Sequence, residues 1–119
     1  MAVVSPNKTP TSRRYVVIDF ETTGFHPNQG HRVIEIGAVE VVNDTIGRVY
    51  ETLINPGMKI PEVAINVHGI TDQMVLDAPT PEAAFTELST FIGDSIIVAH
   101  NIRFELAFIT AEFQRINQA

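Results

Sequence analysis

The chain has 119 residues, 45% of them hydrophobic and 18% charged, which suits one small domain with a buried core and is too short for two. Its formal net charge of −6 argues against a broad basic face that holds nucleic acid through counterion release alone. The absence of cysteine excludes disulfides and thiolate metal sites, and no apolar run is long enough to span a membrane.

Residues 1–12 contain two prolines and many small polar residues, so we expect a flexible tail ahead of a single domain at residues 13–119. This stretch lacks the apolar segment of a secretory signal, and a cytoplasmic protein is therefore expected. No internal repeat or low-complexity segment interrupts the domain.

The first strongly apolar run, Arg14–Phe20, is rich in β-branched and aromatic residues and predicts a β-strand. Because side chains of a strand alternate between its faces, Asp19 and Glu21 are expected to point the same way, opposite to Phe20. Such a pair is either two solvated acids before a turn, the commoner case for an isolated Asp-x-Glu, or the start of a cation site. Oxygen ligands of this kind suit Mg²⁺ or Mn²⁺.

Two further strands are predicted at Arg32–Val42 and Arg48–Ile54, joined by a hairpin connection at Asn43–Gly47. No helical pattern separates the three strands, so they are expected to form an antiparallel meander. Glu35 lies within the second of them and either braces a site through a hydrogen bond or faces solvent.

The middle of the chain turns from strands to helices. Residues Met58–Asn66 predict irregular chain or a single helical turn, and Thr71 is a suitable N-cap for a short helix at Asp72–Leu76. A stronger signal begins at Thr80, where an N-cap is followed by proline and an acid in the first helical turn. The apolar stripe of this second helix ends at Gly93.

Ser95–Ala99 is short and almost entirely apolar, as expected for a strand covered on both faces that pairs parallel to the first strand. A last helix is predicted from about Arg103 to Ile116, with apolar positions around most of its circumference. A right-handed crossover places the start of this helix at the carboxyl end of the fourth strand, beside Asp19 and Glu21.

Glu105 lies in the first turn of the last helix, so three carboxylates from two elements are expected at one edge of the sheet. Such a set suits two divalent ions around a phosphate, one activating a water and the other stabilising the leaving oxygen. An acid at a helix N-terminus is by itself more often a partner of the helix dipole.

Five stretches, in this order, resemble motifs of the DEDD 3′–5′ exonucleases, and specifically of the DnaQ-like (DEDDh) group that includes the proofreading epsilon subunits of bacterial DNA polymerase III. The first motif alone is moderately specific, whereas the ordered series is highly specific and covers about residues 14–116. The matching stretches are Asp19-Phe20-Glu21-Thr22-Thr23-Gly24, Arg32–Val39, Ile54-Asn55-Pro56, His68-Gly69-Ile70-Thr71 and Val98–Glu105.

The resemblance implies an α/β, ribonuclease H-like exonuclease fold, with a three-stranded antiparallel meander, a parallel fourth strand and flanking helices. It further implies hydrolysis of the 3′-terminal phosphodiester of a nucleic acid, preferably single-stranded DNA, with two Mg²⁺ or Mn²⁺ ions. By similarity Asp19 bridges both ions, Glu21 holds the hydrolytic ion and Glu105 completes the acid set. The substrate residues implied by the motifs are Thr22, Thr23, Gly24, His68, Ile70 and Asn101.

Two departures from the family pattern qualify these expectations. The second motif of the family ends in Asp, whereas this chain has Glu105, and one extra methylene displaces the carboxylate. The sequence also ends before the third motif, which supplies a histidine base and a fourth acid. We therefore expect an incomplete domain, weak or absent activity of this chain alone, and an open apolar edge at Ser95–Ala99.

Two alternatives remain open at this point. One is a non-catalytic module that binds a partner, such as a DNA polymerase or helicase subunit, and it is favoured by Glu105 and by the missing third motif. The other is an exoribonuclease acting on short RNA, because the contacts to the 2′-hydroxyl that distinguish RNA from DNA cannot be read from residue spacing.

Overall fold

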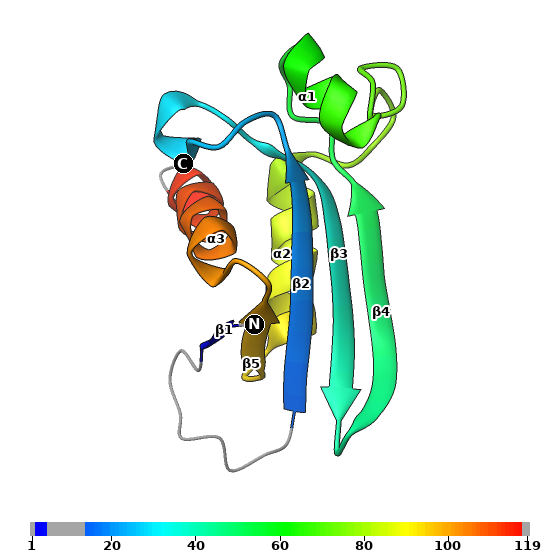
Figure 1. Cartoon of the computed structure of the whole chain (residues 1–119), viewed down its shortest axis with the longest axis vertical. Coiled ribbons are helices and arrows are strands. Elements are labelled where there is room, and N and C mark those ends of the chain that lie inside the picture. The colour runs from blue at the N-terminus through cyan, green and yellow to red at the C-terminus, as the bar shows by residue number, and fades with distance from the viewer. Residues whose placement is uncertain (1, 5–13, 118–119) are drawn as a thin grey trace.

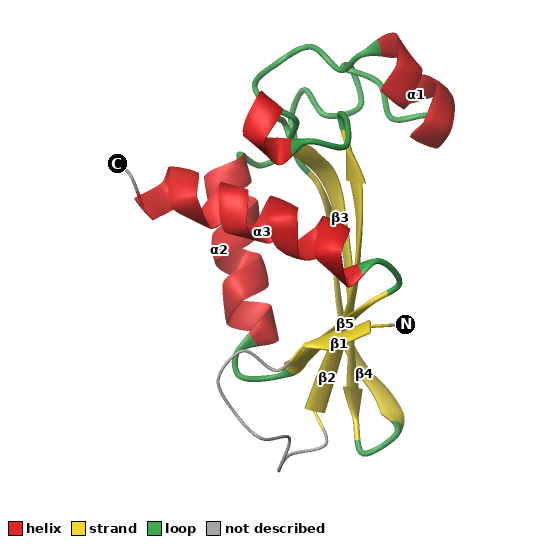
Figure 2. Cartoon of the chain, turned by 60° about the vertical axis from the view of Figure 1, so that its left-hand side comes forward, coloured by secondary structure: helices red, strands yellow, loops and turns green. Residues whose placement is uncertain are grey.

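The fold is described by a computed structural model, which covers residues 2–4 and 14–117. A five-stranded sheet in the order β1-β5-β2-β3-β4 forms its centre, and two long helices cover one face of this sheet (Figure 1). Seen from the side, the sheet and the two helices form separate layers (Figure 2). No helix in the described part of the chain is long and apolar enough to cross a membrane.

The predicted meander is confirmed by β2 (Arg14–Thr22), β3 (Val33–Val42) and β4 (Thr45–Leu53), which pair antiparallel in chain order. The connection between β3 and β4 is shorter than predicted, because only Asn43 and Asp44 turn the chain. Both have positive φ, 50° and 66°, as a two-residue hairpin turn requires. A bulge between residues 39 and 41 of β3 then shifts the register of β4.

The short strand β5 (Ile96–Ala99) pairs parallel to β2, as predicted from its apolar sequence, and all of its residues are buried. The other edge of β5 is not open, because β1 (Ala2–Val4) pairs with it antiparallel, Val3 opposite Val98. The added strand provides backbone partners that an open edge would lack. Ala2–Val4 of the expected flexible tail form this strand, and residues 5–12 of that expectation lie outside the described residues.

Helix α2 (Pro81–Ile92) follows its predicted bounds closely, and the Thr80 hydroxyl caps it by accepting a hydrogen bond of 3.2 Å from the Ala83 amide. Helix α3 (Ile102–Asn117) is the predicted last helix, extended by a residue at each end. A single 3₁₀ turn, η1 (Pro27–Gln29), lies in the loop between β2 and β3.

The segment between β4 and α2 differs from prediction. Helix α1 (Glu62–His68) forms where irregular chain or one turn was expected, and Gly69 ends it in the left-handed conformation, φ 74°. No helix forms at residues 72–77, which make hydrogen-bonded turns. The Asp72 carboxylate instead accepts a hydrogen bond of 2.8 Å from the Ile60 amide, which ties these turns to the start of α1.

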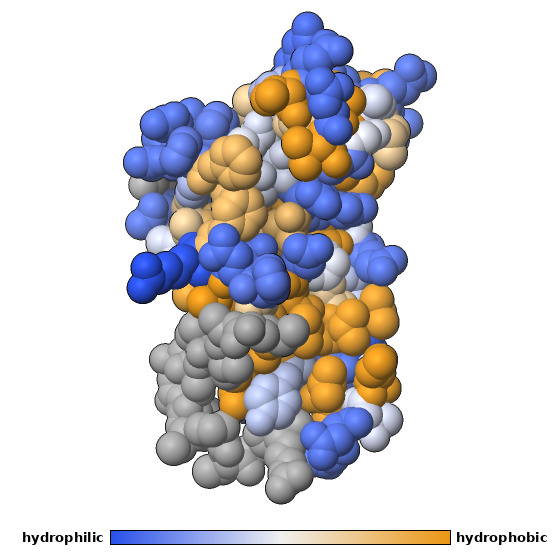
Figure 3. All heavy atoms as spheres, in the orientation of Figure 1, coloured by the Kyte–Doolittle hydropathy of each residue, from blue (hydrophilic) through white to orange (hydrophobic). Residues whose placement is uncertain are grey.

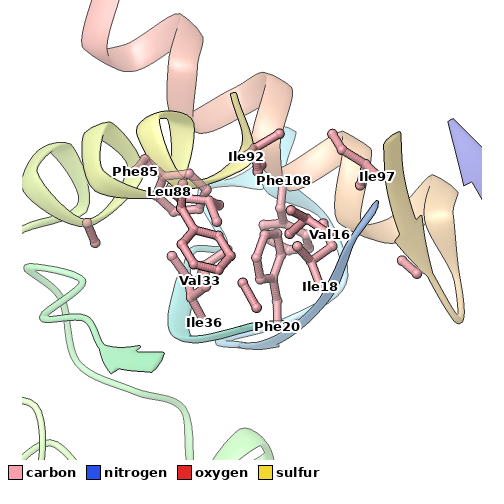
Figure 4. Close-up of a cluster of buried hydrophobic side chains, with 14 of the residues drawn as sticks. Val16, Ile18, Phe20, Val33, Ile36, Phe85, Leu88, Ile92, Ile97 and Phe108 are labelled. Atoms are coloured by element: carbon pink, nitrogen blue, oxygen red, sulfur yellow. The ribbon is translucent and has the colours of Figure 1, made fainter. Parts of the chain in front are cut away.

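The main core lies between the sheet and its two helices (Figure 4). Phe20 is 4% exposed and its ring meets the Phe85 ring of α2 edge-on, with centroids 5.9 Å apart, which confirms its predicted core position. Phe108 of α3 is fully buried in the same cluster. A second, smaller cluster packs α1 beside the start of β3, and its buried members are Ile34, Ile60, Ala64, Ile70 and Val75.

The opposite face of the sheet carries no helix among the described residues. In Figure 1 the strands β2–β4 lie in front of α2, and Figure 3 shows apolar side chains gathered over the lower part of this face. Ile46 and Val49 of β4 belong to it and are 72% and 55% exposed. The acids of the first motif lie towards the other end of the same face.

Candidate active site

Asp19 and Glu21 lie near the carboxyl end of β2 and point away from the core, as the strand alternation predicts. They line one hollow of about 190 Å³ together with Glu35 and Glu51. The strand register explains this grouping: Glu21 lies opposite Glu35, while Gly37 lies between Asp19 on one side and Glu51 on the other.

The carboxylates that line this acidic hollow repel one another. Burial raises the pKa of the Glu35 carboxyl, and the charges of Glu21, Glu51 and Asp19 raise it further. The sequence predicts that Glu35 either braces a site through a hydrogen bond or faces solvent, and it does not identify Glu51. The alternation within β3 pointed to Glu35, but the position of Glu51 depends on the register of β4, which the bulge in β3 shifts.

Glu105 lies in the first turn of α3, which begins just after β5, and β5 pairs parallel to β2. Val98 pairs with Val17, so Ala99 and the start of α3 come level with Asp19. Glu105 is 4% exposed, and burial is the main cause that raises the pKa of its carboxyl; the charge of Asp19 adds to it. The predicted proximity of Glu105 and Asp19 is therefore present.

One oxygen of this buried carboxylate, Oε1, has no hydrogen-bond partner. An unpaired buried carboxylate oxygen is costly unless a cation or a proton compensates it. Asp19, whose charge acts on this carboxyl, offers further oxygen ligands, and carboxylate oxygens fit Mg²⁺ or Mn²⁺. The residues present thus fit a divalent ion in their chemistry.

The complete three-acid set is not assembled, however. In residues 14–117 no three acidic or histidine side chains lie close enough together to hold one metal ion. The charge of Asp19 acts on the Glu105 carboxyl, whereas Glu21 lies opposite Glu35 on the neighbouring strand. Coordination of an ion by all three of Asp19, Glu21 and Glu105 stays a prediction. It would require these side chains to come together when the ion binds.

A second hollow, of about 170 Å³, lies on the other side of the same strand end. It is mostly apolar and is bounded by the end of β2, the loop that follows, α1 and the start of α3. The residues that line it are Phe20, Glu21, Thr22, Thr23, Gly24, Phe25, Val63, Ala64, Val67, His68 and Phe104. The structure thus brings four predicted substrate residues to one cavity: Thr22, Thr23, Gly24 and His68.

The turn after Glu21 is fixed by its own hydrogen bonds. Thr22 donates from its hydroxyl to the Gly24 carbonyl at 2.6 Å. Thr23 is 2% exposed, and its hydroxyl accepts from the Arg32 amide at 2.9 Å, so its side chain is a structural anchor. Gly24 has no room for a side chain, because the His31 ring lies where its Cβ would be.

His68 forms a wall of the apolar cavity with a defined tautomer. Its Nδ1 accepts a hydrogen bond of 3.0 Å from the Ile70 amide, so the proton sits on Nε2, which donates to the Thr22 carbonyl at 3.2 Å. Both ring nitrogens are therefore used within the chain, and the ring connects α1 to the end of β2.

The two remaining predicted substrate residues lie elsewhere. Ile70 is 4% exposed and packs in the small cluster beneath α1, so it supports the cavity wall without lining the cavity. Asn101 is exposed just before α3 and also lies outside the cavity lining; its backbone carbonyl accepts hydrogen bonds from the Phe104 and Glu105 amides.

Comparisons with known proteins show the family of the chain. A family model described as exonuclease (RNase_T) matches residues 16–119. The chain is 37% identical over 110 residues to the DNA polymerase III subunit epsilon of Rickettsia felis, covering 92% of this chain and 48% of that protein. It is 43% identical over 102 residues to the PolC-type DNA polymerase III of Staphylococcus aureus, covering 86% of this chain and 7% of that protein.

Among solved structures, apo exonuclease I superposes with a TM-score of 0.78 at 20% identity, over 88% of this chain and 25% of that one. Exonuclease I in complex with a dA16 oligonucleotide superposes with a TM-score of 0.77. The chain spans about half the length of the epsilon relatives it matches. It belongs to the exonuclease family, and it has the ribonuclease H-like fold of exonuclease I.

Proposed function

We propose that this chain carries the 3′-end site of a metal-dependent 3′–5′ exonuclease that acts on DNA. The observation that supports this proposal most is the buried Glu105 carboxylate, one oxygen of which is unpaired and whose pKa the charge of Asp19 raises. A purely structural acid would find a hydrogen-bond partner for this oxygen, because buried polar groups are nearly always satisfied. A cation is the partner that its surroundings suit.

In this proposal Asp19, Glu21 and Glu105 would hold the ions, and Mg²⁺ or Mn²⁺ bound there supplies an activated water and stabilises the leaving oxygen. The apolar cavity on the other side of β2 receives the terminal nucleoside, with its base against Val63, Val67 and Phe104. Glu21 lines both hollows, so the scissile phosphate would lie close to it.

DNA is the proposed substrate because two relatives that match over 110 and 103 residues are named as epsilon subunits of DNA polymerase III. A role in replication or proofreading, a polymerase or helicase subunit as partner, and a cytoplasmic location belong to the same proposal. Action on short RNA is the alternative substrate, and comparison of deoxyribose and ribose ligands separates the two.

We further propose that this chain alone is weakly active or inactive. Glu105 replaces the family's Asp, and the sequence offers no candidate for the histidine base or the fourth acid. The described acids do not yet form a three-ligand set. These observations favour a non-catalytic binding module as the second candidate function.

Product binding tests the site without requiring turnover. We expect a deoxynucleoside 5′-monophosphate to bind in the presence of Mg²⁺ and to shift the amide resonances of Thr22, Gly24 and Val67 in NMR spectra. Asp19→Asn should remove this binding, while Val49→Thr, on the exposed apolar end of the sheet, should keep it. Binding that persists in EDTA, or that shifts only residues outside the cavity, would contradict the proposal.

Turnover is measured separately with a 5′-labelled single strand of DNA and Mn²⁺. We expect little or no stepwise shortening from the 3′ end by this chain alone. Robust degradation that depends on Asp19 would overturn the expectation of weak activity while supporting the exonuclease assignment.

A further inference from the structure

Helix α3 carries a second buried acid that the proposed chemistry does not use. Glu112 is 1% exposed, which is unusual for a charged residue, and it lies seven residues after Glu105. Residues seven apart lie close to the same face of a helix, two turns along. One face of α3 therefore presents both Glu105 and Glu112 to the rest of the domain.

Glu112 is bound mainly by Arg32, which lies just before β3. The Arg32 guanidinium donates two hydrogen bonds, from Nη2 to Oε1 at 2.5 Å and from Nε to Oε2 at 3.1 Å. Arg115 adds an ion pair of 3.2 Å to Oε2 without hydrogen-bond geometry. The two-point contact with Arg32 fixes both distance and orientation, which a single contact does not.

Both arginines also form hydrogen bonds with the loop that carries Thr23 and η1. The Arg32 amide donates to the Thr23 hydroxyl at 2.9 Å, and the Arg32 carbonyl accepts from the Thr23 amide at 2.8 Å. Arg115 donates from Nη2 to the Pro27 carbonyl at 2.9 Å. Glu112 thus connects α3 to the segment that directly follows Asp19 and Glu21.

Stability alone does not explain this arrangement. Desolvation of a buried ion pair often cancels its attraction, so an apolar contact of similar volume would hold α3 to the sheet equally well. An apolar contact would not fix the position of the Thr23 turn along the helix. What the ion pair adds is a defined spacing between two elements, each of which carries acids of the proposed site.

We propose that Glu112 is a positioning residue of the proposed active site. Through Arg32 it sets the distance between the end of β2, with Asp19 and Glu21, and the first turn of α3, with Glu105. The effect on metal binding rests on the proposed function, whereas the anchoring of the loop does not.

The chain provides a matched control in Glu40, another buried acid held by two arginines, Arg14 and Arg48, but located away from this loop. Glu112→Gln and Glu40→Gln both remove a buried charge while keeping the side-chain shape. Hydrogen exchange at the Thr23 and Arg32 amides reports the loop, and Mn²⁺ titration reports the site.

We expect Glu112→Gln to accelerate hydrogen exchange at the Thr23 and Arg32 amides by at least about 10-fold beyond any change at the core amides of β2. We also expect it to weaken Mn²⁺ binding about 10-fold, as loss of an outer partner of a metal site does. Glu40→Gln should leave both unchanged relative to the core. Equal effects of the two variants on loop exchange and Mn²⁺ affinity would show that Glu112 acts only on stability.

If Glu112→Gln does not fold, Arg32→Lys replaces it, because lysine keeps the charge but loses the two-point contact. Its control is Arg48→Lys, and the expected and contradicting results are the same. If the unsubstituted chain binds no Mn²⁺, the proposed function fails, but the exchange of Thr23 and Arg32 still decides whether Glu112 anchors the loop.

Discussion

At the scale of single residues, the site is built from acids held under unfavourable conditions. Burial and neighbouring charges raise the pKa values of both Glu35 and Glu105. Such groups lower the stability of the folded protein at neutral pH unless a cation is bound. Retention of a destabilising buried acid at one edge of the sheet is typical of functional sites, where stability and activity oppose each other.

The first prediction concerns this cost. Without metal, Glu105→Gln should raise the free energy of unfolding by about 1 kcal/mol, because it removes a buried charge with an unpaired oxygen. Chemical denaturation in EDTA measures the change. Glu87→Gln, on the exposed surface of α2, is the control and should change stability by no more than about 0.5 kcal/mol. A destabilised Glu105→Gln protein would mean that the carboxylate is well satisfied.

The scale of secondary-structure elements shows what the sequence could and could not predict. The apolar alternation of β2, the capped stripe of α2 and the run of β5 were sufficient to predict those elements, because local pattern and burial agree there. The pairing of Ala2–Val4 with β5 is a long-range contact that local composition does not encode. The turns at residues 72–77 depend on Asp72 binding the Ile60 amide, which helix signals at Thr71 do not reveal.

The candidate site likewise has features that the sequence predicts and features that depend on contacts between distant parts of the chain. Alternation in β2 predicted the shared face of Asp19 and Glu21, and the crossover rule predicted the proximity of Glu105. The contribution of Glu51 depends on the register of β4. The anchoring role of Glu112 depends on its contact with Arg32 across 80 residues, for which the sequence of α3 gives no signal.

The second prediction concerns helix α1, which has 7 residues and is too short to be stable alone. His68 connects it to Thr22 and to Ile70, so His68→Ala should destabilise α1 by about 1–3 kcal/mol through the loss of two hydrogen bonds. Hydrogen exchange of α1 amides should accelerate while that of α2 amides does not.

Val67→Ala is the control for this change, since Val67 is the neighbouring residue and is 80% exposed. It should leave exchange in α1 nearly unchanged. Equal acceleration in α1 and α2 for His68→Ala would mean that His68 supports the whole domain and not this helix.

At the scale of the whole molecule, two buried ionic clusters tie the layers together, one at Glu112 and one at Glu40. Hydrogen bonds from Arg48 and Arg14 lower the pKa of the Glu40 carboxyl to about 2 from its usual 4.5. The Arg48 guanidinium also lies 4.9 Å from the centre of the Phe91 ring, which connects β4 to α2. Glu40 therefore joins three strands and a helix.

The third prediction follows from the lowered pKa of Glu40. On acidification the unfolded carboxyl takes up its proton near pH 4.5 and the folded one only near pH 2, so the free energy of unfolding should fall between these values. The raised pKa values of Glu35 and Glu105 act with opposite sign and favour the folded state as the pH falls towards their usual value of 4.5. Denaturation curves from pH 7 to pH 2.5 should therefore show a maximum in the mildly acidic range.

Glu40→Gln checks the assignment, because it removes the group that titrates late in the folded state. The variant should be less stable at pH 7, and its stability should fall less steeply below pH 4.5 than that of the unsubstituted chain. An acid limb of unchanged slope would assign the acid sensitivity to other carboxyls.

The central claim is that the edge formed by β2 and α3 is a divalent-metal site, and calorimetric titration with Mn²⁺ tests it most directly. We predict weak binding by the unsubstituted chain, loss of that binding in Asp19→Ala, and retention in Val49→Thr, whose side chain lies on the exposed apolar end of the sheet. An isotherm that is the same for Asp19→Ala and the unsubstituted chain would contradict the account.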